Sequence, residues 1–196
     1  MKKILPEGAV LIPDTAKKVF DGEIFDVYQW PQKMFDGSTE TFEMLRRPDT
    51  VQIIGVRDNK LVMVKDEQPN RPSRTHFPGG RVDEEDESWL AAAQREVLEE
   101  TGMTFKNWKL IFVNQPFTKI EQFVPWFVAT EVIDQTQPKP DAGERIELVD
   151  LTFDDVRSSV FKGRGYVSYA IPIFAEARSL EDLINKPEFK GQEVDR

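Results

Sequence analysis

Cysteine is absent from this sequence, and histidine occurs once, at His76. Without cysteine the chain cannot form disulfides, iron–sulfur clusters, thiolate metal sites or a cysteine nucleophile. A single histidine excludes zinc sites built from several histidines and disfavours a serine–histidine catalytic triad. These two absences remove thiol chemistry and multi-histidine zinc chemistry from the functions to consider.

Runs of basic residues and long apolar stretches are also lacking. The 196 residues include 26 basic and 35 acidic side chains, for a net charge of −9. Long nucleic acids and anionic membranes attract basic surfaces, so neither is an expected partner. Pro6, Glu7 and Pro13 interrupt the N-terminal apolar residues, whereas a secretory signal needs about 7–15 of them unbroken. Since no stretch approaches the roughly 20 apolar residues that span a bilayer, we expect a cytoplasmic protein.

The length fits one domain with a small appendage. The residue pattern predicts half-buried strand residues at 19–30, a return strand at 41–45, a hairpin of 51–56 and 61–64, strands at 75–77, 109–113, 126–132 and 145–151, and helices at 89–101, 154–161 and 167–183. Strands on both sides of a helix indicate a mixed α/β sandwich. We expect an N-terminal β subdomain over residues 1–46, a main domain over 47–185, and a frayed polar tail over 186–196.

The helix expected at 89–101 has clear ends in the sequence. Ser88 can accept hydrogen bonds as its N-cap, and Gly102 stands where a left-handed residue commonly ends a helix. Projected at about 100° per residue, the helix has an apolar stripe that should face the core. The stripe contains Leu90, Ala93 and Val97.

Three carboxylates lie beside that stripe within one turn: Glu96, Glu99 and Glu100. Like charges four residues apart cost about 0.2–0.5 kcal/mol per pair. Anions in the last turn also face the negative end of the helix dipole, which costs another ~0.3–1 kcal/mol each when exposed. A bound divalent cation such as Mg²⁺, which takes oxygen ligands, would resolve this repulsion. Arg95 could hold one of these carboxylates in place.

A tight loop, Phe77–Gly80, precedes the helix. Its glycines allow the backbone to approach a ligand closely, so that a carbonyl could join the metal shell. A carboxylate-held Mg²⁺ with open positions suits phosphoryl chemistry, because it neutralises phosphate oxygens and lowers the pKa of a bound water.

These residues resemble the signature of the Nudix hydrolases, which is a glycine, a glutamate, and then Arg-Glu-x-x-Glu-Glu-x-Gly. Here the positions are Gly80, Glu87 and residues 95–102, which read REVLEETG. Seven residues separate Glu87 from Arg95, as in the family. Six residues separate Gly80 from Glu87 where the family has five, and the extra residue falls in the acidic loop 83–86. We expect this loop to be solvated surface.

The resemblance implies a Nudix-type α/β/α sandwich with a mixed sheet and a small N-terminal β subdomain. It implies Mg²⁺ as the cofactor, with Mn²⁺ as a possible substitute. The implied site residues are Glu96 and Glu100 as main metal ligands, Glu99 as a further ligand or base, the Gly79 carbonyl as a backbone ligand, and Arg95 and Glu87 as supporting residues.

The family's reaction is hydrolysis of a nucleoside diphosphate linked to another group. A β subdomain followed by the signature resembles the branch that cleaves ADP-ribose and nucleotide sugars, in which the N-terminal strands help to build a homodimer and the substrate site. Two alternatives remain. One is a Nudix hydrolase of dinucleoside polyphosphates or non-standard nucleoside triphosphates, and the other is a non-catalytic sensor of nucleotide sugars on the same fold.

Candidates for the base and for substrate contacts lie outside the helix. Glu144 precedes the strand expected at 145–151 and resembles the position of a catalytic base in related pyrophosphatases, and Glu147 is a second possibility. Either could equally be an exposed acid. Arg71 and Arg74, in the segment before the signature, could bind a phosphate or sugar, because guanidinium groups pair well with phosphate. Trp30 could stack on a base or pack in the subdomain core.

Overall fold

The computed structural model describes residues 1–69, 71–139, 145–163 and 169–195, with the side chain of Arg71 left out. Its main body is a mixed six-stranded sheet with the order β11-β6-β5-β10-β8, in which β7 also pairs with β6. Strand β10 runs parallel to β5 and antiparallel to β8. The strands are β5 (Gln52–Arg57), β6 (Lys60–Gln68), β7 (Arg71–His76), β8 (Met103–Asn114), β10 (Val124–Gln135) and β11 (Arg145–Leu151).

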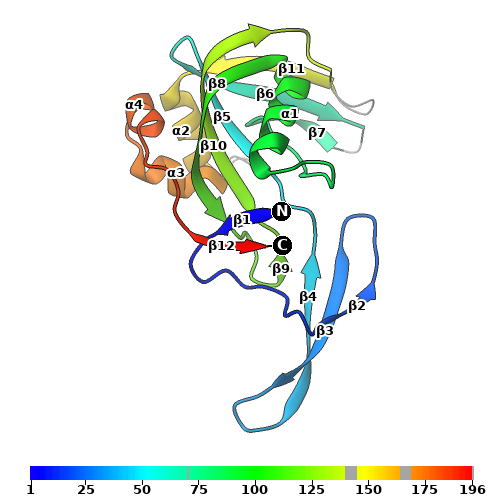
Figure 1. The fold of residues 1–196 in the computed structure, drawn as a ribbon. Coiled ribbons are helices and arrows are strands. Elements are labelled where there is room, and N and C mark those ends of the chain that lie inside the picture. The colour runs from blue at the N-terminus through cyan, green and yellow to red at the C-terminus, as the bar shows by residue number, and fades with distance from the viewer. Residues whose placement is uncertain (70, 140–144, 164–168, 196) are drawn as a thin grey trace.

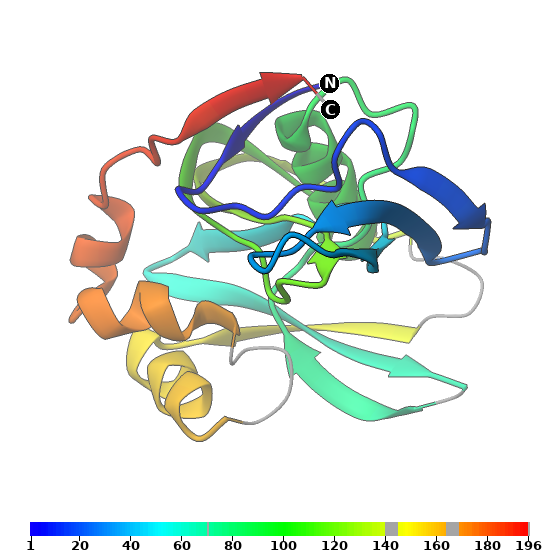
Figure 2. The same cartoon turned by 90° about the horizontal axis from the view of Figure 1, so that it is seen from below.

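Helices cover both faces of this sheet (Figure 1). Helix α1 (Trp89–Thr101) packs on one face, and α2 (Phe153–Phe161), α3 (Ile171–Glu176) and α4 (Leu180–Ile184) pack on the other. Successive residues of a strand point to opposite faces, and accordingly Trp126 joins the α2–α4 core while Phe127 joins the α1 core. The view from below shows the same three layers (Figure 2). The expected α/β/α sandwich with a mixed sheet is confirmed.

Helix α1 begins and ends at the predicted residues. The Ser88 hydroxyl accepts a hydrogen bond from the Ala91 amide at 3.1 Å, and Gly102 adopts the left-handed conformation with φ 70°. Ala93 and Val97 are buried as expected, but Leu90 is 36% exposed. Trp89 instead fills the N-terminal end of the buried stripe.

The N-terminal sheet consists of β2 (Lys17–Phe20), β3 (Asp26–Lys33), β4 (Thr39–Arg46) and the short β9 (Ile120–Glu121). Strands β3 and β4 form a long hairpin that extends away from the body (Figure 1). A turn after Phe20 divides the predicted strand region 19–30 into β2 and β3. Because β9 pairs with β4, this sheet contains strands from both sides of the boundary expected at residue 46.

The C-terminal tail is not frayed, and this prediction was wrong. Strand β12 (Gln192–Asp195) pairs antiparallel with β1 (Lys2–Leu5), so that the two ends lie side by side (Figure 1). Phe189 and Val194 pack against the α1 core, and the Phe189 amide donates to the Leu110 carbonyl at 2.7 Å. Two apolar side chains and a backbone ladder are enough to order a segment that is otherwise polar.

The single helix predicted over 167–183 is also wrong for the residues that the structure describes, since it shows α3 and α4 instead. Ala177 leaves helical geometry with ψ 128°, and the Ser179 hydroxyl caps the new helix by accepting from the Asp182 amide at 3.0 Å. Residues 164–168 lie outside the described part. Among the described residues, every helix is too short or too polar to cross a bilayer.

Candidate functional site

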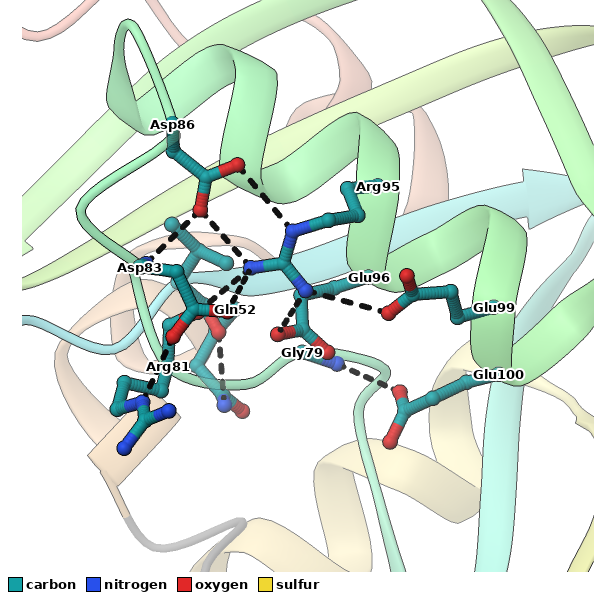
Figure 3. A network of polar contacts seen from close by, with 10 residues as sticks. Gln52, Gly79, Arg81, Asp83, Asp86, Arg95, Glu96, Glu99 and Glu100 are labelled. Carbon is teal, nitrogen blue, oxygen red and sulfur yellow. Dashed lines mark hydrogen bonds and ion pairs between the residues drawn. The ribbon is translucent and has the colours of Figure 1, made fainter. Parts of the chain in front are cut away.

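The loop before helix α1 is held along strand β5 by backbone hydrogen bonds. The Ile53 amide donates to the Pro78 carbonyl at 2.8 Å, and the Val51 amide donates to the Gly80 carbonyl at 2.9 Å. These bonds fix the loop on the core of the sheet. Gly79 is thereby brought against the C-terminal half of the helix (Figure 3), and Gly80 lies against the side chain of Glu96.

Both glycines lie in close approach to neighbouring groups. Gly79 has φ +147°, and a Cβ there would overlap the Val51 carbonyl. A Cβ at Gly80 would overlap the carboxylate of Glu96. The Glu96 carboxylate therefore occupies the space that a side chain at position 80 would fill.

The three glutamates of the helix differ in their surroundings. The side chain of Glu96 is 13% exposed and that of Glu99 is 45% exposed. Glu100 is buried and accepts a hydrogen bond from the Gly79 amide at 2.8 Å. The three glutamates predicted for one turn therefore lie there, and Glu100 is tied to the loop through the Gly79 amide (Figure 3).

Arg95 is the centre of the polar network drawn in Figure 3. One edge of its guanidinium contacts two of the predicted ligands, with Nη1 at 2.9 Å from Glu96 Oε1 and 3.2 Å from Glu99 Oε2. The opposite edge contacts Asp86, with Nε at 3.2 Å from Oδ1 and Nη2 at 2.9 Å from Oδ2. Nη2 also donates to the Arg81 carbonyl at 2.9 Å. The expected bracing by Arg95 is present in this geometry.

The acidic loop 83–86 is only partly solvated surface. The Asp86 side chain is 8% exposed, and Asp83 lies 3.4 Å from the Arg95 guanidinium and 2.8 Å from that of Arg81. Glu87, which the family resemblance makes a supporting residue, is exposed. In this loop Arg95 therefore contacts Asp86 and Asp83, while the adjacent Glu87 is exposed.

Burial and the charge of Arg95 shift the pKa of Glu96 in opposite directions. Burial raises the pKa of Glu96 to about 7, although Arg95 acts to lower it. Hydrogen bonding to Arg95 lowers the pKa of Asp86, and Asp86 in turn raises the pKa of the Arg95 guanidinium. Asp86 is therefore firmly ionised, while Glu96 carries a charge that Arg95 compensates incompletely.

The donor set suits a hard divalent cation. In the part of the chain that the structure describes, no three acidic or histidine side chains converge on one point as a metal shell. Arg95 lies against Glu96 and Glu99, and Glu100 is turned to the Gly79 amide. However, the carboxylate oxygens in this turn, among them the largely covered Glu96 side chain, are of the kind that hard divalent cations take as ligands. The residues present fit such an ion.

The other predicted residues lie apart from this network or outside the description. Arg74 Nε is 3.8 Å from the buried Asp66, and Glu147 pairs with Lys65 at 3.0 Å on the sheet. Trp30 is 9% exposed and packs with Ile12 and Met44. Glu144 and the side chain of Arg71 fall outside the described residues.

A cleft of about 1120 Å³ separates the N-terminal sheet from the loop that follows Gly80. Acidic side chains outnumber basic ones in its lining, and the basic ones are Lys3, Lys18, Arg46, Arg47 and Arg81. Arg46 pairs with Glu121 at 2.9 Å, whereas the Arg47 guanidinium lies 5.5 Å from the centre of the Phe25 ring. Neither Arg46 nor Arg47 was predicted from the sequence, although a pair of arginines between the strands expected at 41–45 and 51–56 was a signal that could have found them.

Comparison with protein families places residues 46–166 in the NUDIX domain model. The match covers well over half of the chain and includes the loop, the helix and the glutamates described above. The chain belongs to the Nudix family. It is thus a Nudix pyrophosphohydrolase, as its signature and fold predict.

Two further similarities extend over most of the chain. The ADP-ribose pyrophosphatase of Bacillus subtilis (strain 168) is 27% identical over 164 residues, which cover 79% of this chain and 87% of that protein. A crystal structure of an ADP compounds hydrolase superposes with a TM-score of 0.63 at 19% identity, covering 87% of this chain and 89% of the other. The similarity to this crystal structure concerns the fold. Because it covers 87% of the chain, it includes residues outside the range 46–166 of the family model, in the N-terminal sheet or the C-terminal elements.

Proposed function

We propose that this Nudix protein hydrolyses the pyrophosphate bond of ADP-ribose or a related nucleoside diphosphate sugar, giving a nucleoside monophosphate and a sugar phosphate. The observation that carries the proposal is the row of glutamates held between Arg95 and the Gly79–Gly80 loop. The choice of substrate is supported by the similarity to the B. subtilis ADP-ribose pyrophosphatase over most of both chains.

In this proposal Mg²⁺ is the cofactor, with Mn²⁺ as a substitute. Glu96, Glu100 and the Gly79 carbonyl hold it, and Glu99 is a further ligand or the base. A bound Mg²⁺ would supply neutralisation of the phosphate oxygens and a lowered pKa for a coordinated water. Arg95 keeps Glu96 and Glu99 in fixed orientations, so that little reorganisation is needed when the substrate binds.

The attacking water needs a proton acceptor. Glu99 is suited to this role because its side chain is 45% exposed and lies at the open side of the network. Glu144 is the alternative acceptor in the proposal, and it lies outside the described residues. Either carboxylate would take one proton from the water as its oxygen attacks phosphorus. The bond from that phosphorus to the bridging oxygen would break, and the bridging oxygen would leave as part of the second phosphate product.

The N-terminal sheet has two roles in the proposal. It forms one wall of the cleft near the signature loop, where Arg46 and Arg47 could meet phosphate groups although most charged side chains of the lining are acidic. Arg71 and Arg74, on the strand that leads into the Phe77–Gly80 loop, are further proposed contacts for the distal phosphate or sugar. For Trp30, burial among apolar side chains favours packing over base stacking. The second role of the sheet is to form a homodimer.

The experiment that tests the activity incubates the purified protein with Mg²⁺ and a panel of nucleoside diphosphate derivatives, dinucleoside polyphosphates and nucleoside triphosphates, and identifies the products. We expect ADP-ribose or a nucleotide sugar to give a nucleoside monophosphate. Tight binding of one compound without turnover would favour a sensor instead. Preferred cleavage of a dinucleoside polyphosphate or a triphosphate would move the protein to another substrate class.

Replacement of Glu100 tests the site itself. Glu100→Gln should lower kcat by two or more orders of magnitude, because a metal carboxylate is lost. The fold should persist, since an amide oxygen can still accept the hydrogen bond from the Gly79 amide. Glu188→Gln removes the same charge from an exposed position and serves as the control. Near-normal turnover by Glu100→Gln would contradict the proposed metal site.

A further inference from the structure

The guanidinium of Arg95 uses its whole hydrogen-bonding capacity. A guanidinium carries five N–H donors, and the observed acceptors are Asp86 Oδ1, Asp86 Oδ2, the Arg81 carbonyl, Glu96 Oε1 and Glu99 Oε2. With every donor used, the plane of the guanidinium cannot rotate without breaking several bonds. The orientation of the edge that faces Glu96 and Glu99 therefore depends on what holds the opposite edge.

Asp86 holds that opposite edge. It accepts from both Nε and Nη2, at 3.2 and 2.9 Å, which is the two-point geometry that carboxylate and guanidinium groups favour. Its side chain is 8% exposed, so water competes little for these bonds. It also accepts from the Asp83 amide at 2.9 Å, which fixes its own rotamer in the loop. Asp86 is thus both ionised and immobile.

The neighbouring Glu87 does not share these properties. It occupies the glutamate position when the signature is counted back from Arg95, yet its side chain is exposed. When the signature is counted forward from Gly80, five residues intervene before Asp86. The inserted residue therefore places an aspartate, one residue earlier in the chain, at the point that contacts the guanidinium.

We infer that Asp86, and not Glu87, is the positioning residue that orients Arg95 and, through Arg95, the metal-binding carboxylates Glu96 and Glu99. This inference rests on the proposed function for the identity of the metal site. Asp86 does not contact the reacting atoms in this account. It acts through Arg95, by restricting the orientations that Glu96 and Glu99 can adopt when a cation binds.

The test compares Asp86→Asn with Glu87→Gln and with Glu85→Gln, which removes the same charge from an exposed position in the same loop. Replacement of residues that orient metal ligands typically weakens metal affinity or activity 10–100-fold. We expect Asp86→Asn to raise the Kd for Mn²⁺, measured by electron paramagnetic resonance, by about that factor. Glu87→Gln and Glu85→Gln should leave this Kd within about twofold of the wild-type value.

Two further readouts separate positioning from a general loss of structure. Asp86→Asn should lower kcat about tenfold or more while KM for the substrate changes by less than about threefold, at a temperature well below its Tm. Asp86→Glu, which keeps the carboxylate, should recover part of the loss. The double variant Asp86→Asn/Arg95→Lys should be little worse than Arg95→Lys alone, because both changes break the same contact.

A direct probe of the contact does not depend on metal or substrate. The Nε–H signal of Arg95 in a ¹⁵N spectrum should be protected from exchange in the wild type and in Glu85→Gln, and unprotected in Asp86→Asn. If the wild type cleaves no nucleoside diphosphate, the proposed function fails while this signal and the Mn²⁺ Kd still test Asp86. The inference is overturned if Glu87→Gln, and not Asp86→Asn, weakens Mn²⁺ binding or exposes the Arg95 signal.

Discussion

At the residue scale, Glu96 carries a charge that its surroundings oppose. Its carboxylate is 13% exposed, and burial raises its pKa from 4.5 to about 7. In the unfolded chain the group would titrate near its ordinary value. The folded, metal-free protein therefore binds one more proton than the unfolded chain over the range from about pH 5 to about pH 7.

This difference predicts a pH dependence of stability in the presence of a chelator. The contribution of Glu96 is most favourable below pH 4.5 and is lost as the pH rises through about 7. The free energy of unfolding should therefore fall between pH 5 and pH 8, by at most about 3 kcal/mol from this group. Urea denaturation at several pH values measures the effect.

Glu96→Gln provides the comparison, because its side chain cannot ionise. The variant should be the more stable protein at pH 8, and the difference should shrink toward pH 5. Added Mg²⁺ should stabilise the wild type more at pH 8 than at pH 6, since metal and proton compete for the same oxygens. Parallel stability curves for the two proteins would show that the burial of Glu96 has no such effect.

Residue identities at the site were predictable from sequence to different degrees. The positions of Glu96, Glu99 and Glu100 follow from helical periodicity alone, and the structure places them in one turn as expected. The partner of Arg95 did not follow, because it depends on the path of an acidic loop and not on spacing. Asp86 and Glu87 are adjacent in this loop, and only the structure reveals that Asp86 is the carboxylate that reaches the guanidinium.

At the scale of elements, the site depends on how closely the Phe77–Gly80 loop approaches helix α1. The two glycines of this loop lie close to different groups. A methyl group at Gly79 would meet the rigid Val51 carbonyl, in a backbone conformation that side chains rarely adopt. A methyl group at Gly80 would meet only the end of the flexible Glu96 side chain.

Alanine at these two positions should therefore give opposite phenotypes. Gly79→Ala should destabilise the fold by about 1–3 kcal/mol or more, because the backbone is strained and must shift. Gly80→Ala should change stability little but should displace the Glu96 carboxylate, so that Mn²⁺ affinity and kcat fall at least tenfold. Thermal unfolding together with metal titration of both variants measures the two effects. Equal loss of stability in the two variants would contradict this distinction.

Elements with local signals were predicted well, and elements that depend on distant partners were not. Helix α1 is defined by its own caps, at Ser88 and Gly102, so its bounds were predicted from sequence. Strand β12 was missed because its residues are polar and its order comes from β1, at the other end of the chain. The break between α3 and α4 was missed because helical periodicity does not reveal that Ala177 leaves helical geometry.

At the scale of the whole molecule, the β3–β4 hairpin extends from the body, and β2 lies at the edge of the same sheet (Figure 1). Every residue of β2 is exposed, including Val19 at 53% and Phe20 at 59%. Apolar side chains on an unpaired strand edge favour association with another chain. This surface supports the proposed homodimer.

A charge on this strand should prevent association. We expect the wild type to be dimeric in light scattering coupled to gel filtration, and Val19→Glu to be largely monomeric at the same concentration. Because Val19 is exposed, the circular dichroism spectrum should not change. Ile133→Glu adds the same single negative charge at an exposed apolar position of β10, outside this sheet, and controls for charge alone. A Val19→Glu protein that remains dimeric would exclude β2 as the interface.

The pairing of β1 with β12 also suggests that the chain could be circularly permuted. Lys2 lies opposite Asp195 in the ladder, so a short flexible linker could join these strands into a closed hairpin. New termini could then be opened at an exposed turn, such as the one at Asp58–Asn59 between β5 and β6. Such a circular permutant should keep the α1 core and the carboxylate row intact. The geometry of the glutamates therefore depends on how the strands and the helix pack, and not on the order in which the chain connects them.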